Sequence, residues 1–309
     1  MEKTTCNLCG SMGHDIFFDS IINPEFEERF RLVKCKNCGL VYLSPRPTKK
    51  NISNYYPQET YWSPKRNAFK TYYHLYNFIF SEIKKGRILD IGAGTGLFLS
   101  YFKNKGWNVA GVEVSATACK TAKKLFNINL ITGDLLNIKL PSKSFDLVTL
   151  NNVIEHLHDP KKTLVKIHKI LKDDGFAMIS CPNIKSFGAR LFADRWYGID
   201  VPRHLYQFDR QTLEKLLNTS GFKIIKFSNN FWQHNYEIIF ESFRILFSPS
   251  RRNILAKNYR PNAGNVVHTK YSYIKKMVAS PFKFGSGLIA TLEPFFGGGE
   301  IITVLVKKI

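Results

Sequence analysis

The stretch RILDIGAGTGLFLSYF, from Arg87 to Phe102, constrains the fold of this chain more than any other. It opens with an apolar run that has the length of a buried strand. Three alternating glycines, Gly92, Gly94 and Gly96, come next, followed by a run with helical character. Glycines let a backbone approach a ligand closely because they carry no Cβ. The stretch therefore predicts a strand, a ligand-binding turn and a helix.

After Arg87 the sequence continues to alternate between strand and helix. Strands are expected near 87–91, 108–113, 128–132, 145–151, 175–181 and 222–228, and helices near 96–105, 115–126, 160–172 and 210–219. The segments LKDDGF and NTSGF read as helix C-termini that lead into strands through glycine. The closing segment, EIITVLVKKI, reads as a further strand. This order predicts an α/β fold with a parallel, doubly wound sheet.

The spacing of the three glycines limits which class of ligand the turn can bind. A dinucleotide-binding turn needs GxGxxG, in which the third glycine lets the helix pack close to the strand. Here the spacing is GxGxG, and position 97 is Leu. The run from Asp90 to Gly96, DIGAGTG, resembles the glycine-rich motif of the class I, Rossmann-like S-adenosylmethionine-dependent methyltransferases. The resemblance implies a seven-stranded, doubly wound methyltransferase sheet and S-adenosylmethionine as the cofactor.

Positions further along the chain agree with this resemblance. Glu113 ends the second strand, where a carboxylate accepts both ribose hydroxyls, and Asp134 follows the third, where it accepts from the adenine amino group. Ligands of open α/β sheets bind at the carboxyl ends of the strands, so these signals converge on one crevice. The expected cofactor-binding residues are Asp90, Gly92, Ala93, Gly94, Gly96, Glu113, Val114, Asp134, Leu135, Asn151 and Asn152.

Two CxxC pairs lie near the start of the chain, and each is followed by a glycine. Their cysteines are Cys6, Cys9, Cys35 and Cys38. Four thiolates suit tetrahedral Zn²⁺, and two equal knuckles leave no open coordination position, so a structural metal is favoured over a redox role. Residues 1–50 are therefore expected to form a zinc-ribbon module. The continuation CGLVYLSPRPT resembles modules attached to bacterial methyltransferases that act on sugars, lipids and other small metabolites.

The remaining chain divides by composition. Residues 51–86 read as an aromatic linker and a lid helix, and 87–309 as the methyltransferase domain with an insertion at 231–298. The net charge is +21, and Ser242 to Leu292 holds nine Lys/Arg and no Asp or Glu. One helical stripe is formed by Trp232, Tyr236, Phe240, Phe243 and Phe247. Apolar faces flanked by basic residues suit membrane interfaces, so an anionic membrane surface is the expected partner of the insertion. A solvated cap or an oligomer contact is the alternative.

Two segments could supply a catalytic base. Methyl transfer from a sulfonium is an in-line displacement, which needs alignment and, for a hydroxyl acceptor, removal of a proton. His156 lies in NNVIEHLHD, just past the fourth strand, and His204 lies in DVPRHLYQF, after the fifth. Each histidine could instead only brace its loop. The expected substrate-binding residues are Trp196, Tyr197 and Arg203, although Arg203 could also brace the loop.

Two nucleic-acid chemistries are disfavoured. Adenine amino methylation usually shows a D/N-P-P-Y/F turn after the fourth strand, where this chain has NNVI from Asn151. Pyrimidine C5 methylation needs a nucleophilic thiol, typically in a Pro-Cys pair, and Cys181 precedes its proline. We expect O-methylation of a small-molecule, sugar or lipid-linked acceptor. The alternative is an RNA methyltransferase, but residues 1–50 carry a charge of only +2.

The expected location follows from the absence of targeting signals. No run of 18 or more apolar residues appears, and the N-terminus shows no secretory signal. The chain is therefore expected to be cytoplasmic, with peripheral contact to the inner face of the membrane through 231–298.

Overall fold

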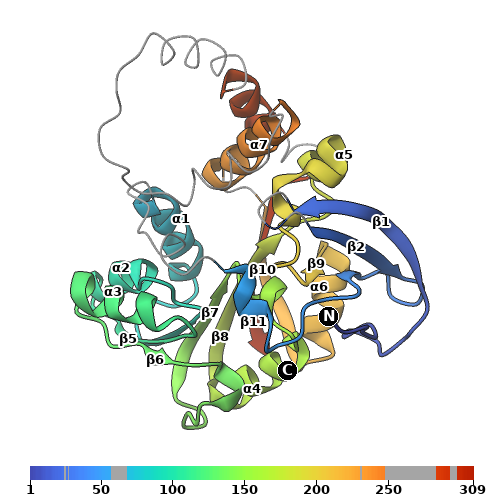
Figure 1. The fold of residues 1–309 in the computed structure, drawn as a ribbon. Helices are drawn as coiled ribbons and strands as arrows, with labels where there is room; N and C mark the ends of the chain where they lie inside the picture. The colour runs from blue at the N-terminus through green and yellow to red at the C-terminus, as the bar shows by residue number, and fades with distance from the viewer. Residues whose placement is uncertain (24–25, 27, 57–67, 230–231, 248–282, 293–297) are drawn as a thin grey trace.

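Two β-sheets make up the framework of the computed structural model (Figure 1). The structure describes residues 1–309 except 24–25, 27, 57–67, 230–231, 248–282 and 293–297. The larger sheet has seven strands in the order β10-β11-β8-β7-β4-β5-β6, and the smaller has four in the order β1-β2-β3-β9. Most of the expected insertion therefore lies outside the described residues.

The seven-stranded sheet confirms the predicted α/β architecture. Its strands are β4 (Arg87–Ile91), β5 (Asn108–Glu113), β6 (Ile131–Thr132), β7 (Phe145–Asn151), β8 (Leu171–Pro182), β10 (Phe222–Ser228) and β11 (Ile301–Lys308). Strands β6, β5, β4, β7 and β8 pair in parallel. Strand β11 runs antiparallel to both β8 and β10, so the sheet is mixed rather than wholly parallel.

Two expected boundaries were wrong. The third strand was expected near 128–132, but β6 holds only Ile131 and Thr132, which pair with the end of β5. The segment LKDDGF was expected to end a helix, but the helix stops at Ile170 and β8 begins at Leu171, which pairs with Phe145. A register shift after Phe145 accommodates the additional residues.

Helices cover both faces of the large sheet. They are α1 (Ala68–Phe80), α2 (Leu97–Asn104), α3 (Ala116–Phe126), α4 (Pro160–Ile170), α5 (Phe187–Phe192), α6 (Arg210–Asn218) and α7 (Trp232–Phe247). Short 3-10 turns are η1 (Ile52–Tyr55), η2 (Leu135–Asn137), η3 (Ile154–His156), η4 (Ala193–Arg195) and η5 (Tyr197–Ile199).

Alternate strand residues enter two separate cores, as the pleat of a strand requires. Ile88 and Leu147 pack with side chains of α1 and α2, whereas Leu89 and Val148 join a core with α4 and α6. The predicted lid helix, α1, contributes fully buried side chains to the first of these cores. Its C-terminal half is therefore part of the helical layer, and a lid function stays a prediction.

The N-terminal sheet is completed by a strand from the methyltransferase domain. Its strands are β1 (His14–Asn23), β2 (Glu28–Cys35), β3 (Val41–Leu43) and β9 (Tyr206–Gln207). Val41 pairs with Gln207, and Tyr42 pairs with Tyr206. In Figure 1 these strands and the α2–α3 layer lie on opposite sides of the large sheet. The expected boundary at residue 50 thus separates parts that share one sheet.

In the predicted aromatic stripe of α7, Tyr236, Phe240 and Phe243 are half-buried, and a different face of the helix enters the core. The side chains of Trp232 and Phe247 lie outside the described part of the chain. Asn235, Ile239 and Ser242 are fully buried, while Phe243 makes an edge contact with Phe192 of α5, with the ring centroids 4.9 Å apart. Tyr236 stacks on Phe240, and both are half-buried. Among the described residues, no helix is both long enough and apolar enough to cross a membrane.

Candidate functional site

The glycine turn adopts the conformation that its sequence predicts. Gly92, Gly94 and Gly96 have φ values of 67°, 53° and 74°, in the left-handed region that side chains with a Cβ rarely enter. A Cβ on Gly92 would lie 2.7 Å from Val153, and one on Gly96 would lie 3.0 Å from Ala122. The turn therefore needs glycine for its backbone and for the close packing around it.

Glu113 at the end of β5 is bound to this turn. Its carboxylate accepts hydrogen bonds of 2.8 Å from the backbone N–H of Gly94 and of Ser115. Burial raises the pKa of Glu113, against the lowering effect of these backbone bonds. An ionised carboxylate has about four lone-pair positions, so roughly two remain for ligand hydroxyls. This arrangement fits the expected ribose contact.

Asp90 at the carboxyl half of β4 is buried beneath the turn. Thr149 of β7 donates a 2.6 Å hydrogen bond to one of its oxygens. Burial raises the pKa of Asp90 to about 7, and the nearby charge of Glu113 acts in the same direction. A cationic ligand group at this position would favour the ionised form of Asp90.

Asp134 lies at the start of η2, where the sequence places an adenine contact, and it already has partners. One oxygen accepts from the backbone N–H of Leu136 at 2.8 Å, and the other lies 2.6 Å from Nζ of Lys49. Burial acts to raise the pKa of Asp134, but the hydrogen bonds from Lys49 and Leu136 and the charges of Lys49 and Lys166 together outweigh it, and the pKa is lowered. The N-terminal module therefore reaches the expected adenine end of the crevice.

Two asparagines at the end of β7 have unmatched oxygens. The Oδ1 atoms of Asn151 and Asn152 are buried without a hydrogen-bond partner among the described residues. Unmatched buried oxygens are costly, and a ligand that donates hydrogen bonds would satisfy them. Of the other expected contacts, Ala93 and Leu135 are buried and Val114 is 68% exposed. The residues of this crevice thus fit S-adenosylmethionine.

The four cysteines of the CxxC pairs converge. Their Sγ atoms all lie within 4.8 Å of one another, with Cys6 and Cys38 3.4 Å apart and Cys9 and Cys35 3.5 Å apart. Both knuckles close with the same hydrogen bond, from the glycine N–H to the carbonyl of the first cysteine. Tetrahedral zinc with Zn–S bonds of about 2.3 Å spaces its sulfurs by about 3.8 Å. The cluster therefore has the size of a metal site with four thiolate ligands.

The two segments that could supply a base meet in one buried cluster. Nδ1 of His204 lies 2.8 Å from the carbonyl oxygen of Gly198, and a carbonyl can only accept. Nδ1 therefore carries the proton, and Nε2 keeps its lone pair. Nε2 lies 4.0 Å from Oε1 of Glu155 and 4.0 Å from Oδ2 of Asp200.

His156 is held in the same way. Its Nδ1 lies 3.0 Å from the carbonyl oxygen of Arg203 and 3.0 Å from the hydroxyl of Tyr56. Its Nε2 lies 4.0 Å from Oε1 of Glu155, and its ring meets that of His204 edge to face at 4.6 Å. Burial, followed by the effect of His204, lowers the pKa of His156 to about 3. Burial also lowers the pKa of His204, so both imidazoles are neutral near pH 7.

Two of the predicted substrate contacts are buried and have hydrogen-bond partners within the protein. Arg203 is fully buried, and its guanidinium donates to Asp200 at 2.6 to 3.1 Å and to the carbonyl of Tyr55 at 3.3 Å. Trp196 is 2% exposed, and its Nε1–H donates to Glu300 at 2.5 Å. These contacts agree with the alternative that Arg203 braces its loop, and direct contact of Arg203 or Trp196 with the acceptor stays a prediction. The sequence did not indicate their acidic partners, which are brought in by the fold.

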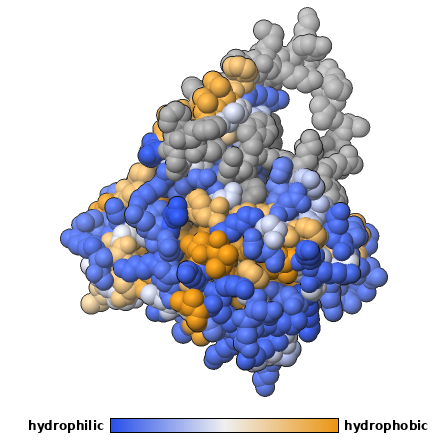
Figure 2. All heavy atoms as spheres, turned by 180° about the vertical axis from the view of Figure 1, so that it is seen from behind, coloured by the Kyte–Doolittle hydropathy of each residue, from blue (hydrophilic) through white to orange (hydrophobic). Residues whose placement is uncertain are grey.

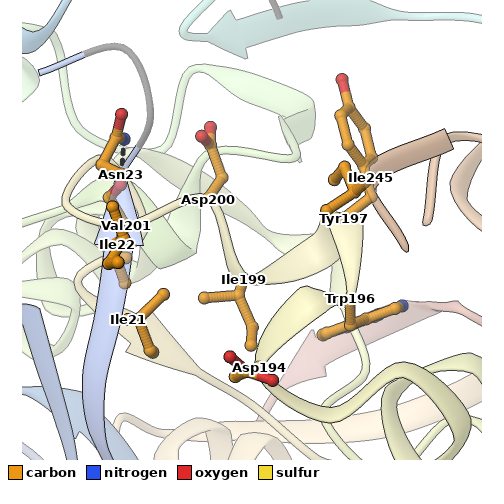
Figure 3. A pocket seen from close by; sticks show the side chains of 10 residues that line it. All are labelled: Ile21, Ile22, Asn23, Asp194, Trp196, Tyr197, Ile199, Asp200, Val201 and Ile245. Carbon is orange, nitrogen blue, oxygen red and sulfur yellow. Dashed lines mark hydrogen bonds between the residues drawn. The ribbon is translucent and has the colours of Figure 1, made fainter. Parts of the chain in front are cut away.

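A small cavity of about 40 Å³ lies between β1 and the segment that leads to the histidine cluster (Figure 3). Figure 3 shows Asn23 on one side and Tyr197 on the other, with Asp200 between them. The cavity is large enough for little more than a water molecule. It is lined by Ile21, Ile22, Asn23, Asp194, Trp196, Tyr197, Ile199, Asp200, Val201 and Ile245. Asp200 is common to the cavity and the histidine cluster.

The comparison with known proteins agrees with this geometry. The methyltransferase domain family matches residues 65–226, more than half of the chain. An uncharacterized protein of Methanocaldococcus jannaschii is 28% identical over 145 residues, which cover 47% of this chain and 68% of that protein. A ubiquinone biosynthesis O-methyltransferase of Rhodopseudomonas palustris is 30% identical over 130 residues, covering 40% of this chain and 51% of the relative.

Another O-methyltransferase and a solved structure are also similar to this chain. A malonyl-[acyl-carrier protein] O-methyltransferase of Hamiltonella defensa is 27% identical over 128 residues, 41% of this chain and 49% of the relative. The matches thus span about half the length of both named O-methyltransferases. The crystal structure of a proposed sarcosine dimethylglycine methyltransferase from Galdieria sulphuraria shares the fold, with a TM-score of 0.51, 16% identity and coverage of 78% and 86% of the two chains.

The matched family segment contains the glycine turn, the acids that follow it and the end of β7. The cofactor crevice therefore coincides with the part of the chain that its relatives share. This chain belongs to the methyltransferase domain family and is an S-adenosylmethionine-dependent methyltransferase.

Proposed function

We propose that this methyltransferase transfers a methyl group to a hydroxyl of a small-molecule, sugar or lipid-linked acceptor. The buried cluster of His156, His204 and Glu155 beyond the end of β7 carries this proposal. Two of the named relatives are O-methyltransferases, which supports oxygen as the acceptor atom. The acceptor would enter beside the cluster, at the carboxyl ends of the strands, where such sheets bind ligands.

The two histidines have the protonation state that the reaction needs. S-adenosylmethionine, when bound, supplies the methyl group from its sulfonium. His204 would accept the hydroxyl proton at Nε2, while Nδ1–H stays on the carbonyl of Gly198 and fixes the ring. His156, whose ring lies edge to face with that of His204, would help to align the acceptor. The oxygen then attacks the methyl carbon in line, and the C–S bond breaks with its electron pair on sulfur.

The four cysteines would hold a structural Zn²⁺. Burial raises the pKa of Cys6, and it raises the pKa of Cys38 to about 11, so a cation is needed to keep both as thiolates near pH 7. The ion would fix the loops that carry the small sheet, and that sheet includes β9, two residues beyond His204. Its role is thus support of the catalytic loop from a distance.

We also propose that an anionic membrane surface contacts the tip of the molecule. The helical residues 283–292 bury Ser286 and Ala290 but expose Phe284, Leu288 and Leu292 by 78%, 52% and 44%. Figure 2 shows apolar side chains gathered on this projection. The sequence 248–282, which precedes these residues along the chain, carries seven Lys/Arg and no Asp or Glu. Apolar side chains next to basic sequence are the composition of an interfacial contact.

RNA methylation remains the competing function and has less support. The expected zinc-ribbon module, residues 1–50, would contact RNA in that case, but it carries a charge of only +2. Its basic Lys49 is engaged with Asp134 rather than presented to a partner. The sequence 242–292, by contrast, has nine Lys/Arg and no Asp or Glu, and so carries a charge of +9.

Labelled S-adenosylmethionine tests these alternatives directly. Transfer of label to sugar nucleotides, polyprenol-linked sugars, small hydroxylated metabolites or structured RNA identifies the acceptor class. The matched variant is His204→Asn, because an asparagine amide can still donate to Gly198 but offers no Nε2. We expect unchanged cofactor binding and a transfer rate reduced by roughly 10² to 10⁴, the usual contribution of a general base. Transfer to RNA alone would reject the proposal.

A further inference from the structure

The carboxyl group of Glu155 is buried without hydrogen-bond partners among the described residues, and burial raises its pKa to about 8. Glu155 is 1% exposed, and neither of its oxygens has a hydrogen-bond partner among the described residues. A carboxylate without a donor or a cation is among the costliest groups to bury. A neutral residue at this position would avoid the cost of burial. The presence of Glu155 therefore points to a binding role for its carboxyl group.

The nearest groups to Glu155 are two imidazole nitrogens with free lone pairs. Nε2 of His156 and Nε2 of His204 each lie 4.0 Å from Oε1. Neither nitrogen can donate, because both rings place their proton on Nδ1, which faces a backbone carbonyl. Three groups that can each bind a metal ion therefore surround one point, and no hydrogen bond joins the carboxyl group of Glu155 to either imidazole.

We propose that Glu155, His156 and His204 bind a divalent first-row transition metal ion. Their ligand atoms lie within 4.8 Å of one another. Around an ion with bonds of about 2.0 to 2.1 Å, tetrahedral ligands are spaced by roughly 3.4 Å, so the atoms need to move inward by a few tenths of an ångström each.

The surroundings of the three ligands are those of a metal site. Histidine ligands usually donate their second ring N–H to a carbonyl or carboxylate, which fixes the ring and its tautomer. Here the carbonyls of Gly198 and Arg203 have this role. Two imidazoles with one carboxylate suit Zn²⁺, Co²⁺, Mn²⁺ or Fe²⁺ better than Mg²⁺ or Ca²⁺, which prefer oxygen ligands.

Three protein ligands leave at least one position open on the ion. The role of this position in methyl transfer rests on the proposed function, whereas binding of the ion does not. An acceptor hydroxyl at the open position would be acidified by the charge of the ion, as metal-bound water is. In the metal-bound form Nε2 of His204 is occupied and cannot be the base, so the proton would pass to solvent water and the alkoxide oxygen would attack the methyl carbon. The base role of His204 given above applies only to the metal-free form. Glu155 offsets part of the charge of the ion.

A titration with Co²⁺ tests the site without relying on activity. The full chain is first loaded with one equivalent of zinc, which prefers the four thiolates and is bound more tightly than Co²⁺. Co²⁺ is then added and followed by its visible absorption and by calorimetry. We expect one equivalent to bind with the weak bands of nitrogen and oxygen ligands, and without the intense thiolate band.

Two variants assign this binding to the cluster. Glu155→Gln removes the anionic ligand with little change of shape, and His204→Asn keeps the bond to Gly198 but removes Nε2. Each should weaken Co²⁺ binding by at least about tenfold. His168→Asn is the control, since His168 lies outside the cluster.

The outcomes separate this inference from the proposed function. No Co²⁺ binding by the zinc-loaded wild type, or equal binding by Glu155→Gln and wild type, overturns the metal site. Binding of S-adenosylmethionine is measured on the same samples without Co²⁺. If the cofactor binds and Co²⁺ does not, only the metal site fails. If Co²⁺ binds and no acceptor hydroxyl is methylated, the metal site stands and the proposed function fails.

Discussion

The carboxylate of Glu113 accepts a 2.8 Å hydrogen bond from the backbone N–H of Gly94. The acid that is expected to hold the ribose thus also holds the glycine turn that is expected to surround the methionine end of the cofactor. The two halves of the crevice are therefore fixed relative to each other before any ligand binds. Such preorganisation lowers the entropy lost on binding.

Replacing Glu113 should weaken cofactor binding without unfolding the protein. Glu113→Gln keeps an oxygen for one backbone N–H but loses the charge and a lone-pair acceptor. Hydrogen bonds to a charged group contribute about 1.5 to 3 kcal/mol, so we expect a roughly 10- to 100-fold higher Kd for S-adenosylmethionine by calorimetry. Glu214→Gln, on the exposed face of α6, serves as the control. Equal affinities of the two variants would show that Glu113 does not contact the ligand.

Gly92 should tolerate a Cβ only if its neighbour is shortened. Gly92→Ala places a methyl 2.7 Å from Val153 and forces alanine into a φ of 67°. The left-handed conformation alone costs roughly 1 to 2 kcal/mol. We expect a lower melting temperature and weaker cofactor binding, with partial recovery in Gly92→Ala/Val153→Ala. Gly285→Ala, where nothing lies within 4 Å, is the control. Absence of any recovery in the double variant would assign the whole effect to the backbone.

Local patterns in the sequence predicted the parts of the fold that depend on local geometry. The glycine turn and the two CxxC knuckles have the expected conformations because left-handed glycines and short loops are specified by adjacent residues. The pairing of β3 with β9 and the contact of Lys49 with Asp134 could not be predicted in this way. They join segments that are distant in sequence and leave no periodic pattern.

The histidine cluster, too, could be predicted from the sequence only in part. The sequence indicated His156 and His204 as separate alternatives for the base. The fold brings both to Glu155, because η3 follows β7 and the loop before β9 crosses the same edge of the sheet. The sequence left Arg203 open between a substrate contact and a brace for its loop, and its ion pair with Asp200, three residues earlier, supports the second alternative.

The raised pKa of Asp90 predicts a pH dependence of stability. Burial raises this pKa from 3.8 to about 7, so the native state holds the proton more tightly than the unfolded chain does. The stabilisation is complete below pH 3.8 and is lost as the pH rises through 7, a loss of roughly 3 kcal/mol between pH 5 and pH 8. Asp90→Asn removes the titrating carboxyl group, and with it this pH dependence, while its amide oxygen can still accept from Thr149.

The measurement is thermal melting of the ligand-free protein at both pH values. The melting temperature of wild type relative to Asp90→Asn should fall from pH 5 to pH 8. A constant difference between the two proteins would mean that Asp90 titrates alike in the native and unfolded states.

Loss of the cysteine cluster should affect catalysis through the shared sheet. Cys38→Ser removes one thiolate, and the knuckle it belongs to precedes β3, which pairs with β9. We expect loss of bound zinc and a fall in the melting temperature of roughly 10 °C, since structural zinc contributes several kcal/mol or more. Hydrogen exchange should increase around residues 205–208, and methyl transfer should slow while cofactor affinity is retained. Cys119→Ser, outside the cluster, is the control. Unchanged exchange at 205–208 would show that β9 does not depend on the metal.

The exposed side chains of residues 283–292 should determine binding to anionic membranes. Phe284 and Leu288 are 78% and 52% exposed, and burying each in a lipid interface is worth about 1.5 to 3 kcal/mol. The variant Phe284→Ser/Leu288→Ser should therefore reduce flotation with phosphatidylglycerol vesicles by at least about tenfold, and higher salt should weaken binding by the wild type because the attraction to lipid is screened. Ile16→Ser changes a residue that is 57% exposed on the N-terminal sheet and should leave flotation unchanged. Equal flotation of the wild type, the double variant and Ile16→Ser would place the membrane contact elsewhere. Tighter binding of the wild type to structured RNA than to vesicles would favour RNA as the partner of the basic sequence.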